Sequence, residues 1–136
     1  MSDPLNTMLF RDLAGKSVFI TGGGSGIGAA LTEGFLAQGA KVAFVGLTDA
    51  SEFCTAMEAT YGVRPLFIKC DIRNVEALNS AIEQARQAHG PISVLVNNAA
   101  RDTRHQLDEW SVAQWDESIA TNLRPHFFTA QAVAPD

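Results

Sequence analysis

A glycine-rich turn lies near the start of the chain, between an apolar run and a run with helical spacing. Val18-Phe19-Ile20 precedes the turn, which reads Thr21-Gly22-Gly23-Gly24-Ser25-Gly26-Ile27-Gly28 and leads into a helix-period run. Glycine allows positive φ and has no Cβ, so the chain can turn tightly and approach a ligand closely. A helix that begins at such a turn presents free N–H groups and its positive dipole end. The turn predicts a phosphate-binding loop, and a glycine turn without a ligand is the alternative.

Short apolar runs alternate with longer helix-period runs along the next part of the chain. Strands are predicted over residues 17–21, 41–45, 66–70 and 92–96, and helices over 26–38, from Thr48 or Asp49 to 61, and from Asn74 to 89. This alternation is typical of βαβ units, which form a parallel sheet with helices on both faces. Right-handed crossovers then give the strand order 3-2-1-4, with a switch point between the first and fourth strands. We expect one three-layer, doubly wound α/β domain over residues 1–136.

The chain changes character after the fourth predicted strand. A charged loop over residues 101–106 is followed by a helix that we expect to begin at Asp108 or Ser111. Apolar residues then recur at helical spacing, namely Trp115, Ile119, Leu123, Phe127, Ala130 and Val133. Pro125 interrupts this pattern, which predicts a kink or a break in the helix.

Charge and composition exclude several classes of protein. The net charge of −5 argues against a nucleic-acid or anionic-membrane surface. Because the sequence shows neither a membrane-length apolar run nor a signal-peptide core, we expect a cytoplasmic protein. Cys54 and Cys70 are too few for a disulfide framework, and the three histidines have no ligand spacing, so no metal site is expected.

Four motifs in order resemble those of the short-chain dehydrogenase/reductase family. They are the glycine turn at 21–28, Cys70-Asp71-Ile72, Asn97-Asn98-Ala99-Ala100 (where the family has Gly in the last place), and Trp115-Asp116 followed by Thr121-Asn122-Leu123. The resemblance implies a Rossmann-type NAD(P)-binding domain. It also implies an NAD(P)-dependent oxidoreductase that transfers a hydride between a nicotinamide cofactor and an alcohol or carbonyl substrate.

The resemblance also assigns roles to single residues. It implies that Asn122 is a catalytic residue, which holds a water in a proton relay, and that the cofactor is bound by Thr21, Gly22, Ser25, Gly26, Ile27, Gly28, Asp71, Ile72, Asn98, Ala99 and Ala100. Asp71 would accept a hydrogen bond from the adenine amino group. The residues alone leave structural alternatives, because Asp can form a turn, Asn can bridge backbone groups, and Asn122 can simply face solvent.

The position expected to bind the cofactor ribose departs from the usual pattern of NAD-binding proteins. An NAD site has Asp or Glu about 20 residues after the glycines, at the end of the second strand. Here Gly46 takes that position, and Asp49 is the nearest carboxylate, which we assign to the ribose. Residues 46–51 contain no Lys or Arg for a 2′-phosphate, so the sequence favours NAD over NADP.

The loop over 101–106 resembles that of sugar 1-dehydrogenases in the same family. Asp102, Arg104 and His105 could therefore contact a polyhydroxylated substrate, such as a sugar, or they could be ordinary charges on an exposed loop.

The family's Ser and Tyr-x-x-x-Lys are absent, because the single tyrosine, Tyr61, is followed four residues later by Pro65. We therefore expect the cofactor-binding half of a longer enzyme, lacking the second half of the fold. The resemblance implies a homodimer or homotetramer at full length. A dinucleotide-binding module without activity is the alternative.

Overall fold

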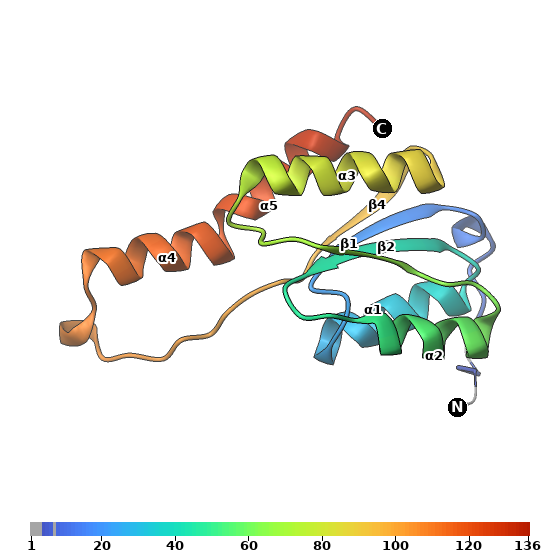
Figure 1. The fold of residues 1–136 in the computed structure, drawn as a ribbon, viewed down its shortest axis with the longest axis horizontal. Helices are drawn as coiled ribbons and strands as arrows, with labels where there is room; N and C mark the ends of the chain where they lie inside the picture. Colours follow the sequence, from blue (N-terminus) through green and yellow to red (C-terminus); the bar gives the residue numbers. More distant parts are fainter. Residues whose placement is uncertain (1–3, 7) are drawn as a thin grey trace.

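The computed structural model describes residues 4–6 and 8–136. Its sheet has four parallel strands in the order β3-β2-β1-β4, and these are β1 (Ser17–Thr21), β2 (Lys41–Gly46), β3 (Leu66–Lys69) and β4 (Ile92–Asn97). This confirms the predicted strand order and the switch point between β1 and β4 (Figure 1). The predicted bounds of the strands were wrong by one residue at the ends of β2, β3 and β4, and β1 agrees fully.

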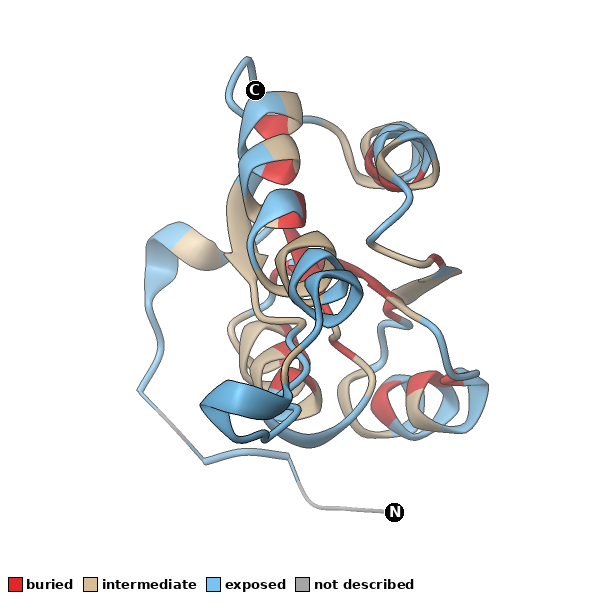
Figure 2. Cartoon of the chain, turned by 90° about the vertical axis from the view of Figure 1, so that its left-hand side faces the viewer, coloured by how far each residue is buried: buried red, intermediate tan, exposed pale blue. Residues whose placement is uncertain are grey.

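Helices cover both faces of the sheet, as the doubly wound prediction requires (Figure 1). One face carries α1 (Gly26–Ala37) and α2 (Ser51–Tyr61), and the other carries α3 (Val75–His89) and α5 (Arg124–Val133). Side chains of β1 alternate between the two cores: Val18 and Ile20 pack with α1 and α2, whereas Phe19 packs with α3 and α5. Figure 2 shows the buried residues between the helices and the sheet. None of the helices within 4–6 and 8–136 has the length and apolar character to cross a membrane.

Local sequence signals explain how α3 begins but not how α2 begins. Asn74 caps α3 as predicted, since its Oδ1 accepts a hydrogen bond from the backbone N–H of Ala77 at 3.1 Å. The predicted cap of α2 at Thr48 or Asp49 was wrong, because the helix begins after Ala50, whose side chain caps nothing. Asp49, one residue earlier, nevertheless accepts a hydrogen bond from the backbone N–H of Ser51, the first residue of α2, at 3.2 Å, and Ala50 is buried in the core that contains Phe44.

The last part of the chain forms two helices instead of one continuous stripe. The segment at Asp108 is only a short 3-10 turn, η2 (Leu107–Glu109), and α4 (Val112–Asn122) begins after the predicted cap Ser111, which forms a capping box with Gln114. Helix α5 follows α4 after a break at Leu123, with Pro125 in its first turn, which confirms the predicted interruption.

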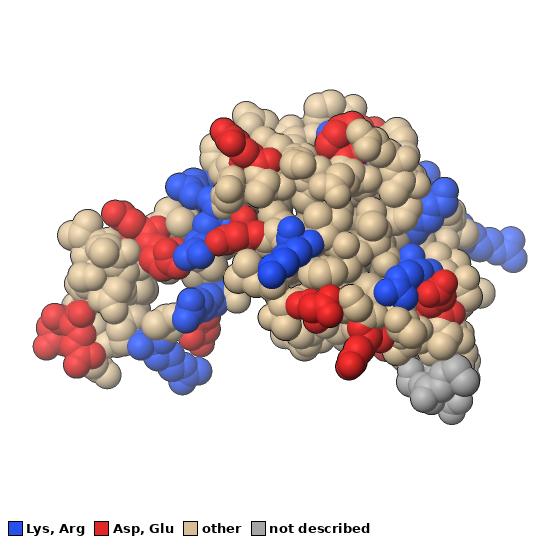
Figure 3. Space-filling model, viewed as in Figure 1, with Lys and Arg blue, Asp and Glu red and all other residues tan. Residues whose placement is uncertain are grey.

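Helix α4 extends away from the body of the molecule, and none of its residues is buried (Figure 1). The predicted apolar stripe is therefore divided: Trp115, Leu123 and Phe127 are exposed, whereas Val133 is buried against the sheet. Acidic and basic side chains lie side by side where α4 meets the body (Figure 3). One such pair is Glu117 of α4 with Arg73, which follows β3.

Candidate functional site

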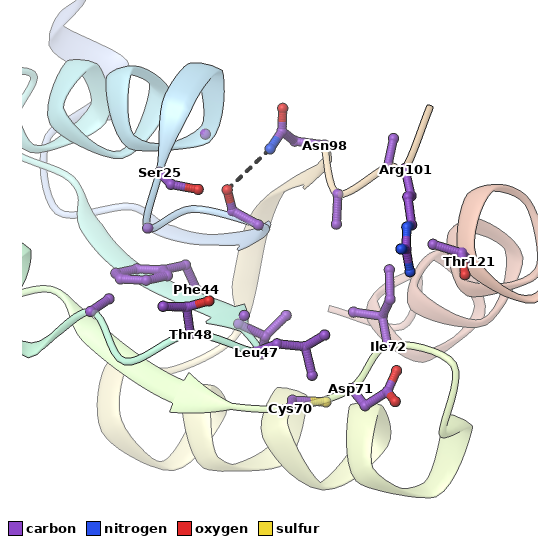
Figure 4. A pocket seen from close by; sticks show the side chains of 18 of the residues that line it. Ser25, Phe44, Leu47, Thr48, Cys70, Asp71, Ile72, Asn98, Arg101 and Thr121 are labelled. Atoms are coloured by element: carbon purple, nitrogen blue, oxygen red, sulfur yellow. Dashed lines mark hydrogen bonds between the residues drawn. The ribbon is translucent and has the colours of Figure 1, made fainter. Parts of the chain in front are cut away.

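A cleft of about 700 Å³ lies at the carboxyl ends of the strands and crosses the switch point between β1 and β4 (Figure 4). This volume is within the range of small-molecule and cofactor sites. Most of the predicted cofactor residues line it together, namely Gly22, Ser25, Ile27, Gly28, Asp49, Asp71, Ile72, Asn98, Ala99 and Ala100.

The glycine turn gives one wall of the cleft its shape. Gly22 and Gly26 have positive φ values of 71° and 53°, which side chains rarely adopt. A Cβ on Gly28 would lie 1.8 Å from the carbonyl oxygen of Gly22, so only glycine lets α1 pack this closely against the end of β1.

The N-terminus of α1 is suited to bind an anion. Its N-cap, Ser25, makes no side-chain capping bond, and its first turn has no acidic residue, whereas α2 and α3 carry Glu52 and Glu76 there. The first N–H groups of α1 therefore lack a capping acceptor and lie beside the cleft. A pyrophosphate would supply those acceptors and the negative charge that the helix dipole favours. The residues present thus fit the phosphate part of a dinucleotide.

Thr21 and Asn98 join the two strands at the switch point. The Thr21 hydroxyl oxygen accepts hydrogen bonds from the backbone N–H groups of Asn98 and Ala99, both at 3.0 Å. The Asn98 side-chain amide donates to the carbonyl oxygens of Thr21 and Gly22 at 3.1 and 3.2 Å. Asn98 therefore bridges backbone groups, the structural role that the sequence left open. Thr21 is buried and does not line the cleft, and neither does Gly26.

Asp49 lines the cleft next to the end of β2, but one of its oxygens is already used. Its Oδ1 accepts hydrogen bonds from the hydroxyl and the backbone N–H of Ser51, at 2.6 and 3.2 Å, and these bonds lower the pKa of Asp49. Thr48 also lines this end of the cleft, and in Figure 4 its side chain lies next to the ring of Phe44. The sequence prediction did not include Thr48 as a cofactor residue, although its place two residues after the end of β2 was a usable signal.

Asp71 lies on the opposite side of the cleft, after β3, and is paired with Arg73. Arg73 Nη2 is 2.7 Å from Asp71 Oδ2, and hydrogen bonds from Arg73 lower the pKa of Asp71. Arg73 also forms an ion pair with Glu117 of α4. Both Arg73 and Glu117 line the cleft. The sequence prediction included neither of them. Glu117 pairs with a residue 44 positions away, which gives no local signal, whereas Arg73 follows Asp71 by two positions, a spacing that was a usable signal.

Asn122 does not line the cleft, but it holds a residue that does. Its Oδ1 accepts a hydrogen bond from the backbone N–H of Arg101 at 2.8 Å, and its Nδ2 donates to the Arg101 carbonyl oxygen at 3.0 Å. The Asn122 side chain is therefore not simply facing solvent. Arg101 and Thr121 line this end of the cleft (Figure 4).

The residues predicted to contact substrate lie outside the cleft. Asp102, Arg104 and His105 are all exposed. The carboxylate of Asp102 is 3.5 Å from Arg104 Nε, and the imidazole of His105 lies against Trp110. The structure brings together the glycine turn, 71–72 and 98–100, and leaves 102–105 on an extended loop.

Comparison with known proteins identifies the family. Residues 16–136 match the sequence profile of the family described as short chain dehydrogenase. The chain belongs to the short-chain dehydrogenase family. It is 51% identical over 128 residues to the "Probable galactose dehydrogenase GalD" of Rhizobium meliloti (strain 1021), covering 93% of this chain and 50% of that protein. It is 44% identical over 134 residues to a D-xylose 1-dehydrogenase of Caulobacter vibrioides (strain NA1000 / CB15N), covering 96% of this chain and 52% of that protein.

A solved structure shows the same fold. The blue fluorescent protein from a metagenomic library, in complex with NADPH, superposes with a TM-score of 0.86 at 33% identity, over 93% of this chain and 53% of that one. This short-chain dehydrogenase chain thus spans about half the length of the relatives that it matches.

Proposed function

We propose that this short-chain dehydrogenase chain binds a nicotinamide dinucleotide in the cleft, and that the whole protein is an oxidoreductase acting on an alcohol or carbonyl substrate. The observation that carries the proposal is the uncapped N-terminus of α1, which opens from the glycine turn into a cleft at the switch point. Family membership supports the same cofactor class.

Each part of the cleft suits one part of the dinucleotide. The first N–H groups of α1, with Ser25, would hold the pyrophosphate, and the ribose would lie between Thr48 and Asp49. Asp71 and Ile72 would contact the adenine, and residues 98–100 would lie at the nicotinamide end. A bound nicotinamide would supply the hydride acceptor or donor.

Residues of this chain would orient the reacting groups. Asn122 fixes the backbone of Arg101, and so it would shape the nicotinamide end of the cleft in addition to the water-holding role that we propose for it. Ser51 is bound to Oδ1 of Asp49, and Oδ2 would be available for the ribose hydroxyls of the cofactor. Residues 46–51 contain no Lys or Arg to bind a 2′-phosphate, so we propose NAD as the preferred cofactor.

The proposed substrate is an aldose that is oxidised at C1. One relative is named a probable galactose dehydrogenase and another a D-xylose 1-dehydrogenase, and this supports the sugar class. Oxidation removes a hydride from C1 and a proton from the hydroxyl, and it yields the lactone. Asp102, Arg104 and His105 stay our candidates for sugar contacts, which would require the loop over 101–106 to move toward the cleft. The cytoplasmic location and the homo-oligomeric state also stay predictions.

Calorimetric titration with NAD and NADP, followed by assays with galactose, xylose and glucose on the full-length protein, tests the proposal. We expect saturable binding of NAD and formation of reduced nicotinamide with at least one aldose. Binding without turnover on any alcohol would instead favour a dinucleotide-binding module, and absence of binding would refute the proposal.

A further inference from the structure

Arg73 is the centre of a charge cluster on the side of the cleft formed by Asp71. Its Nε donates to Asp71 Oδ1 and Oδ2 at 3.0 and 3.2 Å, and its Nη2 donates to Oδ2 at 2.7 Å. Its Nη1 donates to Glu117 of α4. The guanidinium therefore holds both oxygens of one carboxylate and reaches a second carboxylate from another element. This forked geometry is specific to arginine.

The backbone of Arg73 is held as well. Its N–H donates to Asp71 Oδ1 at 3.0 Å, and its carbonyl oxygen accepts a hydrogen bond from Arg124 Nη2 at 2.7 Å. Residue 73 is thus tied to the loop after β3, to α4 and to α5. Since α4 buries none of its residues, the contact with Glu117 helps place this helix beside the cleft.

The hydrogen bonds on Asp71 still leave it able to accept another. Oδ1 already accepts from both the backbone N–H and Nε of Arg73. Oδ2 accepts one short bond, from Nη2, and shares Nε over a longer distance. Because a carboxylate has about four acceptor sites, Oδ2 retains one for a ligand.

We propose that Arg73 is a positioning residue that orients the Asp71 carboxylate toward the adenine amino group, and that Glu117 fixes Arg73 in turn. This inference rests on the proposed cofactor function. The side chains of Arg73, Asp71 and Glu117 are 42%, 35% and 49% exposed. Exposed ion pairs contribute little to the free energy of unfolding, so the role of Arg73 is to orient Asp71. Its loss changes the selectivity for the adenine base more than it changes folding stability.

The test compares NAD with its hypoxanthine analogue, in which a carbonyl oxygen replaces the adenine amino group. Wild-type full-length enzyme prefers NAD, because the analogue would place an acceptor against the Asp71 carboxylate. Arg73→Gln lowers the ratio of kcat/KM for NAD to kcat/KM for the analogue by about tenfold, the value expected for one charged hydrogen bond. The change lies mainly in KM for NAD, and kcat stays within about twofold.

Two carboxylate variants separate positioning from surface charge. Glu117→Gln lowers the same ratio, by less than Arg73→Gln does. Glu58→Gln is the matched control, because Glu58 forms a similarly exposed ion pair with Arg64 at 3.2 Å, away from the cleft. The ratio of kcat/KM values measured for Glu58→Gln equals that of the wild type.

Three results would overturn the inference. The first is an unchanged ratio in Arg73→Gln, and the second is an equal loss of kcat/KM for both dinucleotides, which indicates only structural support. The third is a wild-type ratio of one, which removes Asp71 from the adenine. A wild-type enzyme that uses neither dinucleotide refutes the proposed function itself, and the inference with it, and this result is distinct because no ratio can then be measured.

Discussion

Gly28 and Gly46 both line the cleft, but they differ in whether a side chain could be added there. A Cβ at Gly28 would meet the backbone oxygen of Gly22 at 1.8 Å, whereas a Cβ at Gly46 would meet only the ring edge of Phe67 at 3.9 Å. Gly46 also lacks the positive φ that restricts Gly22. The two positions therefore allow different experiments on the same cleft.

Gly28→Val should displace α1 from the end of β1, because the added side chain would clash with the Gly22 carbonyl oxygen. The N–H groups of α1 then move away from the phosphates, and we expect dinucleotide binding to weaken by about tenfold or more. Calorimetric titration of the full-length protein with NAD, together with a thermal melt, measures both effects. Gly34→Ala is the control, since nothing lies within 4 Å of the added Cβ and alanine favours the helix. Unchanged affinity in Gly28→Val would refute the role of the turn.

Gly46→Asp should sharpen the preference for NAD over NADP by about tenfold, because a carboxylate there can hold the ribose hydroxyls and repel a 2′-phosphate. The ratio of kcat/KM for the two cofactors measures this preference. Gly46→Asn is the uncharged control and should give a smaller change. A shift toward NADP would show that the end of β2 does not face the ribose.

At the scale of elements, polar contacts join α3, β4 and the end of α5. Arg86 Nε of α3 is 2.8 Å from a carboxylate oxygen of Asp136, and the same oxygen accepts a hydrogen bond from the backbone N–H of Ile92 at 2.9 Å. Arg86 also donates to the carbonyl oxygen of Ala132. One carboxylate thus connects a helix to the start of a strand.

Asp136 should make stability depend on pH in the acid range. Hydrogen bonds from Arg86 and Ile92 lower the pKa of Asp136 below its ordinary value of 3.8. Its contribution is therefore fully present above pH 3.8 and is lost as pH falls through the lower folded value. Asp136→Asn should lower the melting temperature at pH 7 and reduce its acid dependence below pH 4. Equal melting curves for variant and wild type across this range would contradict the assignment.

The whole molecule presents two apolar features at its surface. Among residues 4–6 and 8–136, β4 pairs with β1 alone, so its other side is an edge of the sheet. Exposed apolar side chains, including Trp115, Leu123 and Phe127, lie on α4, at the break after it and on α5. Such edges and patches favour association.

Because of these features, residues 1–136 produced alone should associate. The same chain should also be catalytically inactive. Alcohol oxidation needs a base for the hydroxyl proton, and this sequence has no Tyr-x-x-x-Lys. An assay with aldoses and both cofactors, run beside size-exclusion chromatography, tests both statements. Turnover comparable to that of the full-length enzyme, from a clean monomer, would contradict them.

Patterns along the sequence were enough to predict the parallel sheet, its strand order and the place of the cleft. These follow from local patterns: apolar runs, the glycine turn, and caps such as Asn74 and Ser111 act on neighbouring residues. Right-handed crossovers then restrict the topology to few choices. For the same reason, ten of the predicted cofactor residues could be expected to meet at one edge, and they do line one cleft.

The contacts of the polar side chains, in contrast, depend on how distant segments pack together. Asn122 pairs with Arg101 across 21 positions, and Arg73 pairs with Glu117 across 44, so no local sequence pattern predicts either of these two pairings. The predicted cap of α2 was wrong by at least one residue, because the N-cap is Ala50, which is buried, although Asp49 still accepts a hydrogen bond from the N–H of Ser51. A side chain with several possible partners takes the one that packing brings within reach, and that choice is made only when distant segments meet.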